Sequence, residues 1–361
     1  MKIGFDAKRL FHNREGLGSY ARTITQDLLS YYPDHDYHLY TPSIGDRQLA
    51  HDISDHDSCS VHQPKGFAPM WRSRGIVKDL KRDQVQVYLG LSNELPFGIE
   101  KSGIKSVLVL HDMIYKKFPL QYNAIDRAIV HKKVKHAVSV ADMIIAPSQH
   151  TAKDIEECFP GTTSKTRVIY QSVPPAYRKQ ESGSNSSKHI LCVGTINERK
   201  NYHTVIKAMA EIERSVLPKL VIVGEGKQYK QDLVEMIERY DLTDFVTICK
   251  DISTDVLVER YRESIALVMP SAYEGFGIPV LEALTLGVPV IISNNTSLPE
   301  VAGDHGIVID YMDHIALANA IKQLSNPNEK SKLLQNLDSH LEKFDSKSIS
   351  QQYIQLIESI V

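Results

Sequence analysis

The chain has 361 residues, of which 42% are hydrophobic and 24% are charged, and its formal net charge is −2. This length allows two domains that each bury a core, and the composition is that of an ordinary globular protein. No apolar run approaches the length of a membrane span, which argues against an integral membrane protein.

The charge is unevenly divided along the chain. Lys and Arg outnumber Asp and Glu by 25 to 19 in residues 1–180, but are outnumbered by 17 to 25 in the remainder. The acidic second half disfavours nucleic acid as a partner. The four cysteines, at positions 59, 158, 192 and 249, have neither metal-ligand nor redox spacing. Together with the early charges at Lys2 and Asp6, this predicts a cytoplasmic protein without zinc.

The hydrophobic pattern of residues 1–180 predicts a first α/β domain. Strands are expected at 2–7, 37–40, 85–89, 106–110, 143–146 and 166–170, and helices at 19–31, 73–81, 124–139 and 149–158. Residues 181–187 are polar and contain a glycine but no apolar residue, which predicts a linker between two domains.

The alternation of strands and helices restarts after this linker and predicts a second domain over 181–347. Strands are expected at 190–193, 219–223, 246–249, 266–269, 289–292 and 306–309. Helices are expected at 202–213, 227–240 and 256–264, from 278, from 299 and from 312 onward. Such regular alternation predicts mainly parallel, doubly wound sheets covered on both faces, with ligands at the carboxyl ends of the strands. The natural site is then a cleft between the two domains.

Two features of the first domain are candidates for ligand contact. Gly16 and Gly18 fit a dinucleotide-binding spacing, but they follow the first strand too late for its tight turn. We interpret them instead as a flexible loop before a helix that covers phosphate or acceptor. His111 follows the strand at 106–110, where it could act as a general base or donate a hydrogen bond to a sugar hydroxyl.

In the second domain, Arg199 and Lys200 follow the strand at 190–193. Two adjacent cations at this edge could clamp a diphosphate, because Arg binds phosphate bidentately and Lys acts as a mobile charge.

The run from Tyr273 to Leu284 carries the strongest signal. Gly275 and Gly277 allow close approach of the backbone to a ligand, and a proline at 279 predicts that a helix begins near Ile278. The first turn of that helix is a site for phosphate. Glu274 and Glu282 flank it and could accept hydrogen bonds from sugar and ribose hydroxyls. Two alternatives are ordinary first-turn acids and a glycosidase carboxylate pair.

With these motifs, the sequence resembles the retaining, nucleotide-sugar-dependent glycosyltransferases of the GT-B fold, and in particular the fourth family. Within it, the chain is similar to bacterial mannosyl- and rhamnosyltransferases of O-antigen and capsule assembly. The spacing of Glu274 and Glu282 matches the E-x(7)-E motif of the family. The resemblance covers nearly the whole chain and implies two facing Rossmann-like domains, with residues 348–361 forming a helix that returns to the first domain.

The resemblance also implies roles for the candidate residues. Glu274 would contact the donor sugar and Glu282 the ribose, while Arg199 and Lys200 would hold the diphosphate and His111 the transferred sugar. Phe276, Gly277 and Ile278 would supply backbone N–H groups. The chain departs from its relatives at Lys250 and Asp251, which leaves the base open, and at 171–174, where the hinge differs.

The predicted activity is therefore transfer of a hexose, with retention, from a GDP-, UDP- or dTDP-sugar to a glycan or lipid-linked acceptor. No metal or other cofactor is expected, and nothing in the sequence predicts an oligomeric state. The alternatives are a nucleotide-sugar epimerase of the same fold and a catalytically silent nucleotide-sugar-binding protein. Between residues 101 and 135, eight Lys or Arg face only two Asp, which predicts weak peripheral contact with an anionic membrane at its cytoplasmic face.

Overall fold

The computed structural model describes residues 1–14, 16–66, 70–178 and 188–361. These residues form two compact units. The first consists of Met1–Ser172 together with Phe344–Val361, and the second of Val173–Lys343. The linker predicted at 181–187 lies outside the described residues.

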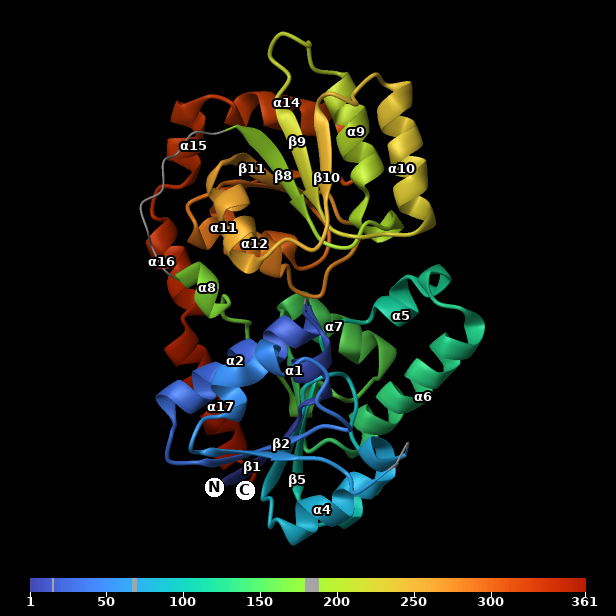
Figure 1. Cartoon of the computed structure of the whole chain (residues 1–361), viewed down its shortest axis with the longest axis vertical. Coiled ribbons are helices and arrows are strands. Elements are labelled where there is room, and N and C mark those ends of the chain that lie inside the picture. The colour runs from blue at the N-terminus through green and yellow to red at the C-terminus, as the bar shows by residue number, and fades with distance from the viewer. Residues whose placement is uncertain (15, 67–69, 179–187) are drawn as a thin grey trace. The chain divides into compact units, whose positions relative to one another are not determined.

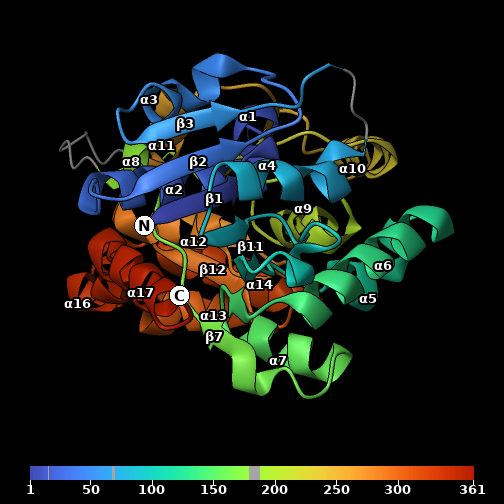
Figure 2. The same ribbon diagram turned by 90° about the horizontal axis from the view of Figure 1, so that it is seen from below.

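The first unit is built on a seven-stranded sheet in the order β3-β2-β1-β4-β5-β6-β7, and every pair of neighbouring strands is parallel. β1, β2 and β3 lie side by side in Figure 2. The chain moves outward from β1 to β3 and then returns to place β4 on the other side of β1. The sheet therefore has a topological switch point between β1 and β4. Its strands are Lys2–Asp6, Asp36–Tyr40, Cys59–His62, Val87–Gly90, Lys105–Val109, Met143–Ala146 and Thr166–Val168.

Helices cover this sheet because their apolar stripes match its buried strands. α2 buries Tyr20, Ile24 and Leu28 at helical spacing in the core. Parallel strands buried on both faces are continuously apolar, as β5 is over Val107–Val109. The helices are α1 (Lys8–His12), α2 (Leu17–Tyr31), α3 (His51–Ser54), α4 (Ile76–Arg82), α5 (Ile114–Lys117), α6 (Ala124–Val140), α7 (Gln149–Cys158) and α17 (Ser346–Glu358).

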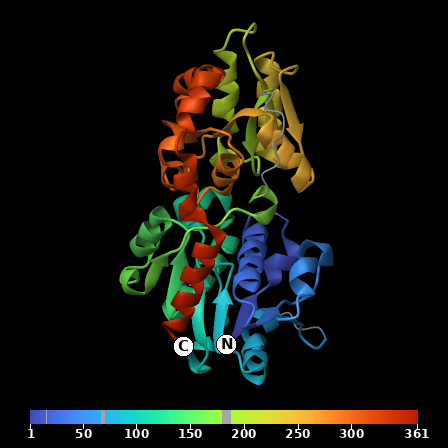
Figure 3. The same cartoon turned by 90° about the vertical axis from the view of Figure 1, so that its left-hand side faces the viewer.

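The last helix, α17, packs against α2 within the first unit. Ile354 and Ile357 belong to the same core as Ile24, and the hydroxyl of Tyr353 pairs with that of Tyr20. Because α17 runs along this unit, the two ends of the chain lie close together (Figure 3). The Asp345 side chain caps the helix by accepting a hydrogen bond from the Ser348 N–H.

The second unit has a six-stranded parallel sheet in the order β10-β9-β8-β11-β12-β13 (Figure 1). Its switch point lies between β8 and β11. The strands are β8 (His189–Val193), β9 (Lys219–Val223), β10 (Val246–Cys249), β11 (Ser264–Met269), β12 (Val290–Ser293) and β13 (Gly306–Ile309). The helices are α8 (Pro175–Arg178), α9 (Tyr202–Ala210), α10 (Gln228–Arg239), α11 (Thr254–Arg262), α12 (Ile278–Thr285), α13 (Leu298–Ala302), α14 (His314–Leu324), α15 (Pro327–Leu333) and α16 (Leu337–Leu341).

The predicted α/β class with two doubly wound sheets is confirmed. The sequence patterns missed the edge strand β3 and the short helices α1, α3, α5 and α8. β3 reads Cys-Ser-Val-His and lies at the edge of the sheet, so only a weak apolar signal marks it. Within the described ranges, no helix combines the length and apolar character that a bilayer span needs.

Candidate functional site

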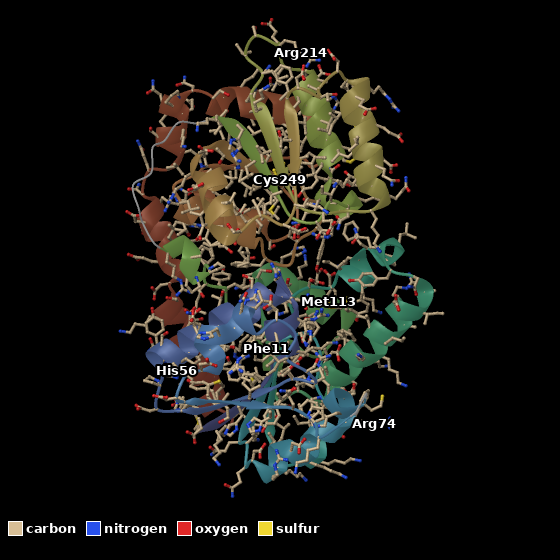
Figure 4. The ribbon with its side chains drawn as sticks, in the orientation of Figure 1. Phe11, His56, Arg74, Met113, Arg214 and Cys249 are labelled. Carbon is tan, nitrogen blue, oxygen red and sulfur yellow. The ribbon has the colours of Figure 1, made fainter. Side chains whose placement is uncertain are left out.

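The candidate site of the second unit lies at its switch point, where β8 and β11 both end. The loop after β8 carries Arg199 and Lys200, and the loop after β11 carries Glu274. The carboxyl ends of adjacent parallel strands meet at one sheet edge, so residues far apart in the sequence come together there. The ends of β9 and β10 lie at the same edge, where β10 finishes at Cys249 (Figure 4).

The centre of the site is one carboxylate held by two cations. Glu274 Oε1 lies 2.6 Å from Arg199 Nη1 and 2.8 Å from Lys200 Nζ. All three side chains are largely buried, with exposed fractions of 11% for Arg199, 8% for Lys200 and 12% for Glu274. Arg199 Nη1 also donates to the carbonyl of Tyr273 at 2.5 Å. The three charges sum to +1, so the cluster retains an excess of positive charge.

Burial and ion pairing act in opposite directions on these groups. Burial alone would raise the pKa of Glu274, but Lys200 and Arg199 outweigh it and lower that pKa to about 2. For Lys200, burial lowers the pKa more than the carboxylate of Glu274 raises it. Glu274 is therefore ionised at neutral pH and cannot serve as the general acid that a glycosidase pair requires.

Lys200 packs against Gly194, and this packing requires that position 194 has no side chain. Gly194 has a φ of 128°, and a Cβ there would stand 2.9 Å from Lys200 Cε. The next loop packs on the same backbone, because a Cβ on Gly224 would stand 2.0 Å from the Gly194 carbonyl oxygen. Gly224 therefore has a structural role, because it allows the loops after β8 and β9 to pack closely against each other.

The loop that carries Glu274 is held in place by hydrogen bonds from the segment after β12. The Glu274 N–H donates to Thr296 Oγ1 at 3.2 Å, and Ser297 Oγ donates to the carbonyls of Glu274 and Phe276. Asn295 Nδ2 donates to the Ala272 carbonyl. Thr296 has a φ of 70°, which a β-branched residue rarely adopts. These residues were not predicted from the sequence, although a polar run directly after a buried strand was the available signal.

Helix α12 begins at Ile278, as predicted. Its N-cap is Gly277, with a φ of 118°, and a Cβ there would stand 2.7 Å from Leu298 Cδ2. Val280 donates the first hydrogen bond of the helix, to Gly277 O. The N–H groups of Gly277 and Ile278 precede it, next to Gly275 and Phe276, and so belong to the positive end of the helix dipole.

Glu282 lies in the second turn of α12 and is buried. One of its oxygens, Oε2, accepts a hydrogen bond from the hydroxyl of Tyr261 on α11 at 2.7 Å. Tyr261 is fully buried, and its ring packs edge-on against Tyr177 of α8. The carboxylate is therefore oriented by a neighbouring helix, a contact that the sequence did not predict.

The glycine loop of the first unit caps a helix. Gly16 is the N-cap of α2 with a φ of 53°. Gly18 lies in the first turn, where a Cβ would stand 1.9 Å from the Asn13 carbonyl oxygen. Arg22 ties the turn together by donating to the carbonyls of Leu10, Asn13 and Arg14. These contacts give Gly18 a packing role, while the Cβ position of Gly16 faces open space.

His111 lies at the carboxyl edge of the first sheet but is buried and paired. Its Nε2 lies 3.0 Å from the Leu91 carbonyl, its Nδ1 lies 3.4 Å from Gln171 Nε2, and its ring packs edge-on against Tyr20. Burial lowers the pKa of His111 to about 4. The imidazole is thus neutral near pH 7, with Nε2–H donating to Leu91 and Nδ1 accepting from Gln171. This pairing argues against the general-base role, because the acceptor nitrogen is already used.

The structure thus brings Arg199, Lys200, Glu274, the loop 275–278 and Glu282 into the second unit, and Gly16, Gly18 and His111 into the first. Two family comparisons match these units in turn. Residues 14–177 match Glycosyltransferase Family 4, and residues 175–338 match Glycosyl transferases group 1. The chain thus carries a Glycosyltransferase Family 4 domain followed by a glycosyl transferases group 1 domain.

This chain has two curated relatives that are named as O-antigen chain mannosyltransferases. It is 28% identical over 252 residues to O-antigen chain mannosyltransferase B of Escherichia coli, covering 66% of this chain and 64% of the relative. It is 31% identical over 194 residues to O-antigen chain mannosyltransferase RfbU of Salmonella typhimurium, covering 54% and 52%. The chain thus spans between half and two thirds of the length of these relatives.

Solved structures share the fold along the whole chain. The HepE protein of Anabaena, in complex with UDP and glucose, has a TM-score of 0.78 at 19% identity and covers 99% of this chain and 100% of its own. WaaG, a glycosyltransferase involved in lipopolysaccharide biosynthesis, has a TM-score of 0.73 at 17% identity, with 99% of each chain covered. At these identities the likeness establishes the fold alone.

We expect Gly194→Ala to displace Lys200 from Glu274, because the added Cβ would stand 2.9 Å from Lys200 Cε. Overpacking of this kind costs about 1 to 3 kcal/mol. Gly287→Ala is the matched control in the same unit, since Gly287 also has a positive φ, 68°, but no atom within 4 Å of the added Cβ. Urea unfolding of both variants measures the difference. Equal losses of stability would mean that Gly194 does not hold Lys200 in place.

Proposed function

We propose that this protein transfers a hexose from a nucleoside diphosphate sugar to a hydroxyl of a glycan or lipid-linked acceptor, in the synthesis of a cell-surface polysaccharide. The observation that carries the proposal is the buried cluster of Glu274, Arg199 and Lys200 beside the start of α12. The two glycosyltransferase domain matches and the O-antigen mannosyltransferase relatives support the reaction class.

The diphosphate would bind between the two cations and the start of α12. Arg199 offers a fork of N–H donors, Lys200 offers a point charge, and the N–H groups of Gly277 and Ile278 lie at the positive end of the helix. Binding would exchange one anion for another, because both cations now contact Glu274. The diphosphate, which carries more charge than one carboxylate, would take over these contacts.

Glu274 and Glu282 would then serve different parts of the donor. Released from its cations, the ionised Glu274 becomes an acceptor for hydroxyls of the donor sugar, close to the bond that breaks. Glu282, which Tyr261 orients through Oε2, would accept hydrogen bonds from the ribose hydroxyls. The first carboxylate therefore selects the sugar and the second selects the nucleoside.

The chemistry needed at this site is stabilisation of the leaving diphosphate. Arg199, Lys200 and the dipole of α12 supply positive charge where negative charge develops, which is electrostatic catalysis. These groups take the part that a divalent ion plays in other phosphate sites, so we infer a metal-independent reaction. We also infer retention of anomeric configuration: no enzyme carboxylate acts as nucleophile, and the acceptor oxygen would bond to the anomeric carbon on the face from which the diphosphate oxygen departs. Within the described ranges, no three His, Cys, Asp or Glu side chains are grouped as metal ligands.

The exposed surface around α6 in the first unit suggests weak attachment to the cytoplasmic face of an anionic membrane. Leu120, just before α6, is 94% exposed, and Ile125 and Ile129 on that helix are 74% and 50% exposed. The exposed Lys132 follows Ile125 and Ile129 at i, i+4, i+7 spacing, so one face of α6 is both apolar and basic. Such a face suits the headgroup region of a bilayer. Lys117 and Lys133 are used in ion pairs with acidic residues of the same unit.

We expect Lys200→Met to weaken binding of the nucleoside diphosphate by roughly 10- to 150-fold, because a charge-assisted contact contributes about 1.5 to 3 kcal/mol. Thermal shift with UDP, GDP, dTDP and ADP identifies the base, and calorimetry with that nucleotide gives the affinity. A ligand at 100 times its dissociation constant stabilises the fold by about 2.7 kcal/mol. Lys207→Met is the control, since Lys207 is exposed in the same unit. Equal affinity of both variants would mean that Lys200 does not bind the diphosphate.

The same titration separates the two carboxylates. Glu274→Gln should leave the affinity for the nucleoside diphosphate equal or higher, since it removes a competing anion, but should weaken binding of the intact sugar donor. Glu282→Gln should weaken both. The reverse pattern would exchange the two assignments.

Incubation with the donor identified in this way should give product in which the transferred sugar keeps its anomeric configuration, and EDTA should leave the rate unchanged because Arg199 and Lys200 supply the positive charge. NMR of the product measures the configuration. Loss of activity in EDTA with rescue by magnesium or manganese would contradict the electrostatic mechanism. Donor binding without turnover on any glycan or lipid-linked acceptor would favour a silent binding protein.

We expect co-sedimentation with anionic vesicles at low salt and release at high salt, because each Lys or Arg near the surface gains about 1 kcal/mol from anionic lipid and this attraction is screened by salt. Leu120→Ser should reduce the bound fraction. Met312→Ser is the control, since Met312 is 65% exposed in the second unit. If the protein does not bind anionic vesicles even at low salt, the basic segment 101–135 is only a solvated surface.

A further inference from the structure

The edge strand of the first sheet, β3, is attached to its neighbour by few side chains on one of its faces. It lies at the end of the sheet and pairs with β2 (Figure 2). Cys59 and Val61 pack against the core, whereas Ser60 and His62 point to the opposite face, because side chains alternate along a strand. Ser60 is exposed, so attachment of this face depends on His62.

His62 contacts a different partner with each of its ring nitrogens. Its Nδ1 lies 3.3 Å from Asp83 Oδ2, and its Nε2 lies 2.9 Å from Nδ1 of His38 on β2. Tyr40 pairs with His62 across the two strands and stacks on its ring, with centroids 4.7 Å apart. The side chains of His62 and Asp83 are only 20% and 14% exposed. We call the hydrogen-bonded series Asp83, His62 and His38 the histidine relay.

The positions of the protons in the histidine relay follow from Asp83. Hydrogen bonds from Arg82 lower the pKa of Asp83, and the Tyr40 hydroxyl donates to it at 2.9 Å. The carboxylate is therefore ionised at neutral pH and can only accept hydrogen bonds. His62 must then carry its proton on Nδ1, which leaves its Nε2 as an acceptor. His38 must donate to that acceptor, so both neutral imidazoles carry the proton on Nδ1.

Burial is the largest influence on the two histidines, and it lowers the pKa of both. Charged and titratable side chains of both signs surround them. Those that raise the pKa of either histidine are Asp36, Asp79 and Asp83, and those that lower it are Lys2, Arg82 and, for His38, His62 itself. A solvated histidine has a pKa of about 6.5. A detached β3 would therefore bind protons more readily than an attached one as the pH falls below that value.

The histidine relay can accept one proton without losing a hydrogen bond, but not two. A first proton can bind to Nε2 of His38, because that nitrogen has no part in the relay. A second proton from solvent would have to bind to Nε2 of His62. The new N–H bond would use the lone pair that accepts from His38 Nδ1, so this hydrogen bond would break and two imidazolium rings would face each other.

We propose that the histidine relay is a pH-sensitive switch that holds β3 on β2 at neutral pH and releases it in acid. Release would break backbone contacts of the strand pair, such as the hydrogen bond from the Thr41 N–H to the His62 carbonyl. It would leave β2 as an unpaired sheet edge, to which another chain can bind. The switch shares no residue with the donor site and does not depend on the proposed function.

NMR of the full chain with 15N-labelled histidine tests the proton positions. At about pH 8, His38 and His62 should both carry the proton on Nδ1, and between about pH 8 and about pH 4.5 they should titrate in two separate steps. In the His38→Gln variant, His62 should titrate in one step. A proton on Nε2 of neutral His62, or one common step for both rings of the unmodified chain, would overturn the proposal.

Hydrogen exchange measures the release itself. Protection of the β3 amides, corrected for the intrinsic effect of pH, should fall at least tenfold between about pH 7.5 and about pH 5. Each extra proton bound by the detached strand shifts the equilibrium by up to about tenfold per pH unit. β10 is the matched control, because it is also a four-residue edge strand with the same burial pattern and has no histidine. An equal fall in both strands would mean general acid unfolding and would overturn the proposal.

Variants of His62 assign the pH response to its ring. His62→Gln and His62→Phe each remove the proton-binding group, and Phe keeps a ring against Tyr40, so protection of β3 should no longer depend on pH in either variant. His51→Gln should keep the response of the unmodified chain, since His51 is 66% exposed on α3 and lies outside the relay. Melting curves show which variants fold, and the NMR titration of the unmodified chain tests the relay if neither does. An unchanged pH response in a folded His62 variant would overturn the proposal.

Discussion

The buried contact of Glu274 with Arg199 and Lys200 is the constraint on which the second unit depends. Three charged side chains, each at most 12% exposed, share one crevice. Removing such groups from water costs several kcal/mol per ion, and only close opposite charges offset this cost. The polar segment Asn295, Thr296 and Ser297 is therefore required to fix the loop of Glu274, since a misplaced carboxylate would leave two buried cations unpaired.

The position of this contact follows from topology. A parallel sheet that reverses its strand order leaves a crevice between the two central strands, and the loops leaving those strands diverge around it. In the second sheet these strands are β8 and β11, and in the first they are β1 and β4. In both crevices a glutamate lies between two cations: Glu274 between Arg199 and Lys200, and Glu94 between Arg72 and Lys133. The same backbone arrangement thus creates two polar sites from unrelated sequences.

Local sequence patterns predicted the parts of the site that depend on chain neighbours. The start of α12 at Ile278 follows from the glycine and proline beside it, and the placement of Arg199 and Lys200 follows from the apolar strand before them. Contacts across the fold could not be read in this way. Tyr261 reaches Glu282 from another helix, and Arg72 reaches Asp6 across 66 residues. These pairs can be predicted only when the order of strands in the sheet is known.

Burial was equally hidden from the sequence. The position of His111 after a strand was predicted, but its chemistry depends on the carbonyl of Leu91 and the amide of Gln171, which surround it only in the folded unit. A histidine that faces solvent at a strand end is a base, whereas one enclosed by those groups is a neutral hydrogen-bonding element. The position of a residue at the carboxyl end of a parallel strand therefore predicts where ligands bind more reliably than it predicts the chemical role of that residue.

Charge distinguishes the two crevices where geometry does not. Glu274 faces two cations, so the crevice of the second unit has an excess of one positive charge, and its neighbouring helix start adds a further partial positive charge. Asp6 and Glu94 face two cations, so the crevice of the first unit is neutral. An anion therefore gains electrostatic free energy in the former crevice and little in the latter. One additional carboxylate, Asp6 at the end of β1, thus gives two crevices of the same topology different net charges.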